Sequence, residues 1–162
     1  MREIFLTQGQ IALVDDDDYE FISKYKWGAY KHRKGNYYAA RQSSRVNGKR
    51  RHIAMSRQIL GLGQGDKRQV DHINHFTLDN RRDNLRTCTN QQNQQNKISH
   101  RESSSMFKGI CWDKRGEKWL ARIVIKGRQI YLGCWEMEEV AALAYDIAAT
   151  REFGEFANCN FN

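Results

Sequence analysis

The first half of the chain has short apolar runs separated by polar turns, which predicts short strands and small helices. Phe21, Ile22 and Tyr25 recur at helical spacing, which predicts a helix over 19–26 with a buried face. Residues 37–41 and 50–54 flank Asn47-Gly48, a dipeptide typical of tight hairpin turns. Residues 55–60 then suggest a short helix, which a glycine-rich loop ends.

The last third follows a more regular pattern. Residues 107–112, 119–125 and 129–134 are strand-like runs, separated by the turns at 113–116 and at Gly127. An alanine-rich helix is predicted over 138–153. Its predicted buried face, placed at helical spacing, consists of Val140, Ala144, Ile147 and Ala148.

Between these parts lies a strand–loop–strand–helix pattern over residues 68–97. The strands are expected at 69–73 and 85–88, and the helix at 89–97. Residues 98–106 are polar and serine-rich, which is typical of a linker. We therefore expect an α+β chain with a first domain over 1–97 and a second over 107–162. The second is a three-stranded antiparallel sheet packed on one helix.

Charge suggests a polyanionic partner. The 162-residue chain has a formal net charge of +8 and a pI near 9.5. Residues 1–100 contain 18 Lys and Arg against 10 Asp and Glu, whereas residues 101–162 contain 9 of each. Within that second part the excess is positive over 101–128 and negative over 129–162, so we expect the sheet to face phosphate.

Several other classes of protein fit poorly. The four cysteines lie far apart and form no C-x₂-C pair, which argues against a structural zinc site. No run resembles a signal peptide or a membrane span. We therefore expect a cytoplasmic protein with free thiols.

The acidic run Asp15–Asp18 has two interpretations. Four acids could form a second metal site, but a solvated turn with one Asp capping the following helix is the favoured interpretation.

The middle segment carries the chemistry. Hydrolysis of a phosphodiester needs a base for water, a cation and fixed geometry. His72 titrates near neutral pH and is the natural base, while Asp71 offers a hard anionic oxygen suited to Mg²⁺ or Mn²⁺. Asn93 and Asn96 offer carbonyl oxygens from one helix face.

The order D-H-I-N, L-D-N-R-R-D-N-L-R, N-Q-Q-N-Q-Q-N resembles the His-Asn-His (ββα-metal) nuclease motif. The resemblance implies that His72 is the general base, that Asn84 braces the loop, and that Asp71 and Asn93 bind one divalent cation, Mg²⁺ or Mn²⁺. Asn96 remains the alternative ligand. The third motif position is Asn rather than His, a common variant. The segments before the motif also look like those of phage-type homing enzymes, which implies a bacterial or phage-infected host.

Basic side chains near the motif are candidate DNA contacts. Arg81, Arg82 and Arg86 are expected to bind phosphate, or else to pair with Asp79 and Asp83. The predicted hairpin has two equally supported interpretations: a basic ribbon that lies along a DNA groove, or a charged face exposed to solvent. Its candidate residues are Arg41, Lys49, Arg50 and Arg51.

The C-terminal part, through F-K-G-I, K-W-L-A-R-I, L-G, A-A-L-A-Y-D, F-G and N-F, resembles the AP2/ERF DNA-binding domain. That family lays its sheet in the major groove. By position the resemblance implies DNA contacts by Lys108, Arg122, Gln129 and Tyr131, with Arg115 and Arg128 as neighbours. Cys111 and Met137 depart from the family pattern, so only the docking mode is carried over.

The leading hypothesis is a site-specific, metal-dependent endonuclease of homing type that acts on double-stranded DNA as a monomer. The alternative is a non-catalytic DNA-binding regulator with a degenerate nuclease motif. The intact set of Asp71, His72, Asn84 and Asn93 argues against that alternative.

Overall fold

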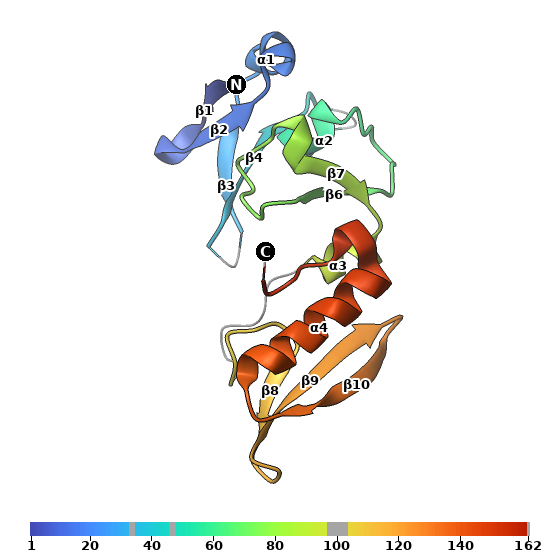
Figure 1. The fold of residues 1–162 in the computed structure, drawn as a ribbon. Coiled ribbons are helices and arrows are strands. Elements are labelled where there is room, and N and C mark those ends of the chain that lie inside the picture. The colour runs from blue at the N-terminus through green and yellow to red at the C-terminus, as the bar shows by residue number, and fades with distance from the viewer. Residues whose placement is uncertain (33–34, 46–47, 97–103, 162) are drawn as a thin grey trace. The chain divides into compact units, whose positions relative to one another are not determined.

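The computed structural model describes residues 1–32, 35–45, 48–96 and 104–161. The chain divides into two compact units, Met1–Asn90 and Gln91–Asn162. The linker predicted over 98–106 lies largely outside the described residues, as does Asn47 of the predicted hairpin turn. The predicted domain limits therefore remain a prediction. Both units mix small antiparallel sheets with short helices, as expected for an α+β chain (Figure 1).

The first unit opens with a small hairpin. Strands β1 (Arg2–Phe5) and β2 (Ile11–Val14) pair antiparallel, with Arg2 opposite Val14. A 3₁₀ turn, Thr7–Gly9, lies between them. Ile4, Ala12 and Val14 are buried and belong to the core of this unit.

Helix α1 (Asp16–Ser23) corrects the predicted helix over 19–26. It begins three residues earlier because Asp16, Asp17 and Asp18 form its first turn, where negative charge is favourable. Asp15 stands at the N-cap, but its side chain makes no capping hydrogen bond. An Asp therefore occupies the N-cap as predicted, but without the side-chain hydrogen bond expected of a cap.

A three-stranded sheet follows in the order β3-β4-β5. Its strands are β3 (Gly28–Lys31), β4 (Tyr37–Gln42) and β5 (His52–Ala54). The predicted hairpin is thus confirmed as the β4–β5 pair, to which β3 adds a strand. Helix α2 (Met55–Ile59) follows, with Met55 and Ile59 buried in the core.

The middle segment contains the predicted pair of strands. Strand β6 (Gln69–His72) pairs antiparallel with β7 (Leu85–Cys88), and a 3₁₀ turn over Arg82–Asn84 leads into β7. Helix α3 (Asn90–Gln95) begins at the last residue of the first unit and otherwise belongs to the second.

The second unit is a three-stranded antiparallel sheet with one long helix (Figure 1). The sheet order is β10-β9-β8. The elements are β8 (Ile110–Asp113), β9 (Lys118–Ile125), β10 (Arg128–Trp135), α4 (Glu138–Phe153) and a 3₁₀ turn over Gly154–Phe156.

Helix α4 has the predicted bounds but buries a different face. Ala141, Tyr145 and Ala149 are buried in the core that α4 shares with the sheet, whereas Val140 is 40% and Ile147 64% exposed. The predicted burial of Val140 and Ile147 is therefore wrong. The helix carries apolar residues around much of its circumference, so helical spacing alone did not identify the packed face.

Only glycine fits at position 109, just before β8, because of its backbone conformation and its close neighbours. Its φ of +80° is unfavourable for other residues, and an added Cβ would lie 2.2 Å from a Tyr145 ring carbon and 2.7 Å from the Arg122 carbonyl oxygen. The ring of Tyr145 therefore packs directly against backbone.

In the described part of the chain, no helix is long and apolar enough to cross a membrane.

Candidate functional site

The candidate acid and base stand together at the end of β6. Asp71 lies opposite Arg86 and His72 opposite Leu85 in the β6–β7 register. The Arg86 guanidinium donates to Asp71 Oδ2 from both Nε, at 2.9 Å, and Nη2, at 2.8 Å. The two side chains are only 7% and 11% exposed, so this ion pair is buried. Asp71 is thus an acid held against a positive charge inside the protein.

His72 is a largely buried imidazole. Its Nε2 atom lies 3.4 Å from Asn80 Oδ1, while the side-chain Nδ2 of Asn80 donates to the Leu78 carbonyl at 3.2 Å. Burial lowers the pKa of His72 below its ordinary value of 6.5, and the contact with Asn80 and the charges of Asp71 and Asp79 oppose that shift. The lowered pKa favours the neutral imidazole, the form that accepts a proton.

The loop after His72 is held across its base by Asn84. Its Oδ1 accepts from the Asn74 backbone amide at 2.9 Å, and its Nδ2 donates to the Asp79 carbonyl at 2.8 Å. Asn74 also donates from Nδ2 to Asp79 Oδ2, and His75 adopts a φ of +63° within the turn. These bonds fix the chain that follows His72.

Asp79 and Arg81 form a second ion pair in this loop. The guanidinium donates from Nη2 to Asp79 Oδ2 at 2.7 Å and from Nε to Oδ1 at 2.8 Å. Hydrogen bonds from Arg81 lower the pKa of Asp79, which is almost fully buried. The structure therefore contains the alternative pairing with Asp79. The predicted contact of Arg81 with phosphate stays a prediction.

Arg82 joins the loop to the acidic run near the N-terminus. Its guanidinium donates to both carboxylate oxygens of Asp18, at 2.8 and 2.7 Å, and its backbone amide donates to Asp15 at 2.7 Å. Asp18 is buried, so the favoured interpretation of a solvated acidic turn is wrong at that position. Pairing occurs with Asp18 rather than the expected Asp83.

Strand β2 supports the same loop through its backbone. The Leu13 amide donates to the Leu78 carbonyl at 2.9 Å, and the Asn80 amide donates to the Leu13 carbonyl at 2.8 Å. The site loop is therefore bonded through its backbone to β2 of the first hairpin and through Arg82 to Asp15 and Asp18 at the start of α1. The supporting roles of Asp18 and Asn80 were not predicted, since neither lies at a position that the motif singles out.

The two candidate helix ligands differ in their surroundings. Asn93 lies within α3 and is half-buried, whereas Asn96 follows the last residue of α3 and is buried. Both belong to the second unit, while Asp71, His72 and Asn84 belong to the first. The choice between the two Asn residues therefore stays a prediction.

Among the described residues, no group of three or more His, Cys, Asp and Glu side chains is arranged to hold a metal ion. This result bears on the acidic run, which forms no such cluster. The predicted set is of another kind, because it combines the Asp71 carboxylate with an amide carbonyl. Both are hard oxygen donors, which fit Mg²⁺ or Mn²⁺ in their chemistry.

The basic residues of the ribbon fall into two groups. Arg41 lies 3.9 Å above the Tyr25 ring and donates to Gln58 Oε1 at 2.8 Å, so it is engaged within the first unit. Lys49, Arg50 and Arg51 are exposed.

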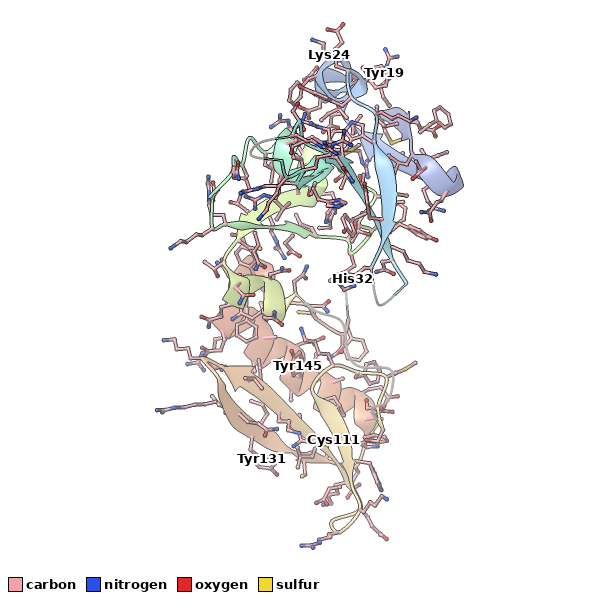
Figure 2. All side chains as sticks on the ribbon, turned by 180° about the vertical axis from the view of Figure 1, so that it is seen from behind. Tyr19, Lys24, His32, Cys111, Tyr131 and Tyr145 are labelled. Atoms are coloured by element: carbon pink, nitrogen blue, oxygen red, sulfur yellow. The ribbon has the colours of Figure 1, made fainter. Side chains whose placement is uncertain are left out.

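In the second unit one sheet face gathers several candidate DNA contacts. Arg122 and Tyr131 lie opposite each other in the β9–β10 register, and Gln129 follows on the same face opposite Val124. All three are exposed, and Arg122 donates to the Cys111 sulfur at 2.9 Å. Tyr131 and Cys111 extend from the strands, whereas Tyr145 comes from α4 (Figure 2). Arg115 and Arg128 are exposed at the two turns of the sheet.

Lys108 differs from the other candidate DNA contacts in this unit. It is partly buried, and its ammonium donates to the Gln95 carbonyl at the end of α3. Burial lowers its pKa from 10.5 to about 8.

The comparisons with known proteins agree with this arrangement. Residues 52–95 match the family model described as HNH endonuclease. A protein of Acanthamoeba polyphaga mimivirus, described as an uncharacterized HNH endonuclease, is 33% identical over 157 residues. The match covers 94% of this chain and 76% of the viral protein. Protein 3.8 of Escherichia phage T7 is 32% identical over 89 residues, which cover 54% of this chain and 72% of the phage protein.

Plant proteins match over a shorter stretch. APETALA2-like protein 2 of rice is 39% identical over 62 residues, or 38% of this chain. The match spans only 14% of that relative, and 20% of an AP2-like ethylene-responsive transcription factor of Arabidopsis thaliana. The viral relative, by contrast, is matched over most of its length and of this chain. The chain therefore belongs to the HNH endonuclease family, a family of enzymes.

Proposed function

We propose that the chain is a site-specific DNA endonuclease of homing type, dependent on one divalent cation and acting on double-stranded DNA. The observation that carries this proposal is the pair Asp71 and His72 at the end of β6, followed by a loop that Asn84 braces. A carboxylate next to a buried neutral imidazole, at the end of a strand and followed by a braced loop, supplies the groups that phosphodiester hydrolysis requires.

His72 acts as the general base in this proposal. Its neutral imidazole takes a proton from the water whose oxygen attacks phosphorus, the bond to the 3′ oxygen breaks, and that oxygen takes a proton from solvent water. The products are a 5′-phosphate and a 3′-hydroxyl. The low pKa caused by burial keeps His72 ready to accept a proton at neutral pH. The hydrogen bonds of Asn84 keep the following loop, and with it the imidazole, in one position.

Asp71 and Asn93 would hold the cation, with Asn96 as the alternative to Asn93. Mg²⁺ or Mn²⁺ bound there supplies positive charge next to the phosphate. Asn93 is preferred because it lies within α3 and is only half-buried, whereas the Asn96 side chain is buried. The donors are oxygens from an acid and an amide, which suits either ion.

The second unit is proposed to dock on DNA as an AP2-like sheet. Support comes from the exposed face that carries Arg122, Gln129 and Tyr131, and from the short match to plant AP2-like proteins. Arginine and glutamine side chains on such a face suit base edges in the major groove. Arg115, Arg128 and the exposed ribbon residues Lys49, Arg50 and Arg51 would add phosphate contacts.

Cleavage of supercoiled plasmid carrying many sequences, including a bound site selected from random DNA, tests the enzyme. We expect relaxed or linear product with Mg²⁺ or Mn²⁺, none with EDTA, and none with His72→Ala. His32→Ala is the matched control, since His32 is exposed in the β3–β4 connection. Tight binding of the selected site without cleavage in either metal would overturn the proposal and favour a non-catalytic DNA-binding regulator.

A further inference from the structure

Helix α3 has little of its own to hold it in place. Its six residues are all Asn or Gln, and none of them is buried. A six-residue helix is far too short to be stable alone in water, and most helices gain their stability by packing an apolar face. Yet this helix carries Asn93, a proposed ligand of the metal. Its order must therefore come from contacts outside the helix.

Lys108 provides such a contact at the C-terminal end of α3. Its ammonium donates to the carbonyl oxygen of Gln95, the last residue of the helix. The last carbonyls of a helix have no partner within it, and a positive charge there is favourable. The burial of this ammonium is costly, since it lowers the pKa of Lys108 to about 8. Electrostatic interactions with Cys159 and Asp146 partly oppose this shift in the pKa of Lys108.

The backbone of Lys108 is itself fixed to the rest of the second unit. Its amide donates to Asn160 Oδ1 at 2.6 Å, and Asn160 Nδ2 donates to its carbonyl at 3.2 Å. Asn160 is held in turn by Asp146 of α4, which accepts from the Asn160 backbone amide at 2.8 Å. A continuous set of hydrogen bonds therefore runs from α4 through Asn160 and Lys108 to the end of α3.

We propose that Lys108 is a positioning residue of the nuclease, which fixes α3 so that Asn93 is presented in one orientation. The second unit would then present Asn93 in a fixed orientation, in addition to its proposed docking on DNA. This proposal rests on the proposed function for the role of Asn93. It assigns Lys108 a task different from the DNA contact that its sequence position implies.

Amide hydrogen exchange tests the clamp without any reference to cleavage. In Lys108→Met, which keeps the length and the apolar stem, we expect faster exchange at the Asn96 amide, which donates to the Gln92 carbonyl at the end of α3. Exchange in β9 should not change. Lys114→Met, at an exposed position of the β8–β9 turn, is the matched control. Unchanged exchange at Asn96 in Lys108→Met would overturn the clamp.

Mn²⁺ affinity and cleavage test the consequence for the site. We expect Lys108→Met to weaken Mn²⁺ binding, measured by electron paramagnetic resonance, and to lower single-turnover cleavage at saturating DNA, each by about 10- to 100-fold. Lys108→Arg, which keeps the charge, should recover part of both. DNA affinity and its salt dependence should equal those of the unaltered protein, since no phosphate contact is lost.

The alternatives give different results. A DNA contact by Lys108 would weaken binding and reduce its salt dependence, with cleavage at saturation unchanged, and that result would overturn the proposal. If the unaltered protein binds Mn²⁺ but does not cleave, the proposed function fails while exchange and Mn²⁺ affinity still decide the role of Lys108. If Lys108→Met loosens α3 without weakening Mn²⁺ binding, the clamp holds but the positioning role is overturned.

Discussion

At the scale of single residues, the site depends on charged and polar groups placed out of water. Asp71 is buried against Arg86, His72 is buried against Asn80, and each arrangement changes what the group does. Burial favours the uncharged imidazole, while the guanidinium compensates the buried carboxylate. In the proposed mechanism these two adjacent residues therefore have different tasks: His72 accepts a proton and Asp71 attracts a cation.

The lowered pKa of His72 predicts the pH dependence of cleavage. With His72 as the proposed base, which works when neutral, the rate should fall as the pH drops through the pKa of His72. Because burial places that pKa below 6.5, we expect the acid limb of single-turnover cleavage to have its midpoint below pH 6.5. Rates measured at saturating DNA and metal from about pH 5 to about pH 8 will show this limb. An acid limb with its midpoint above 6.5 would contradict the prediction.

The buried ion pair predicts a link between metal and stability. Arg86→Leu removes the guanidinium partner of the Asp71 carboxylate, so we expect the free energy of unfolding to fall by about 3 kcal/mol in EDTA. Saturating Mn²⁺ should restore part of this loss, because the cation again compensates the carboxylate. Urea unfolding with and without Mn²⁺ measures both effects.

The double variant Arg86→Leu with Asp71→Asn is the control. It removes both charges, so it should be more stable in EDTA than Arg86→Leu alone and should gain little from Mn²⁺. Equal stability of Arg86→Leu and the unaltered protein in EDTA would contradict the account.

At the scale of elements, close contact between backbone and ring determines how α4 meets its sheet. Tyr145 is buried, with its ring against Gly109 and near the Arg122 carbonyl, and burial raises the pKa of its hydroxyl to about 12. Alanines at 141, 142 and 149 complete the packed face. The face of α4 that carries Tyr145 therefore packs on the sheet, because Gly109 has no side chain and leaves room for the Tyr145 ring.

Gly109→Ala tests this contact. The substitution adds a Cβ within 2.2 Å of the Tyr145 ring and requires a positive φ, so we expect it to lower the free energy of unfolding by more than about 2 kcal/mol. Gly127→Ala shares the positive φ but meets nothing within 4 Å, and it should cost about 1 kcal/mol. Equal losses in urea unfolding would show that the ring contact contributes nothing.

At the scale of the whole molecule, local sequence patterns predict the bounds of helices and strands but not the contacts between residues far apart in the sequence. The bounds of β7 and α4 follow from runs of apolar and polar residues and are confirmed. The pairing of Arg82 with Asp18 is not predictable in this way, since the residues lie 64 positions apart and each has nearer partners of opposite charge. The contact of Lys108 with Gln95 was missed for a similar reason, because its position in the F-K-G-I run pointed to DNA instead.

The candidate site shows the same division. The adjacency of Asp71 and His72 needs only their order in the sequence, and their placement on β6 follows from strand periodicity. The support that the loop receives from β2 depends on a pairing between Leu13 and residues 78–80 that no local pattern announces. The nuclease motif can therefore be found by its spacing, but the reason why its loop is rigid cannot.

The bonds between the loop and the N-terminal part of the chain affect how the motif can be transferred into another protein. The stretch that matches the family, residues 52–95, does not contain the β2 strand or Asp15 and Asp18. A chimera that receives only that stretch contains Asp71, His72 and the loop, but lacks the hydrogen-bond partners of the loop in β2 and α1. A transferred segment that keeps these anchors would therefore include β2 and α1 ahead of the motif.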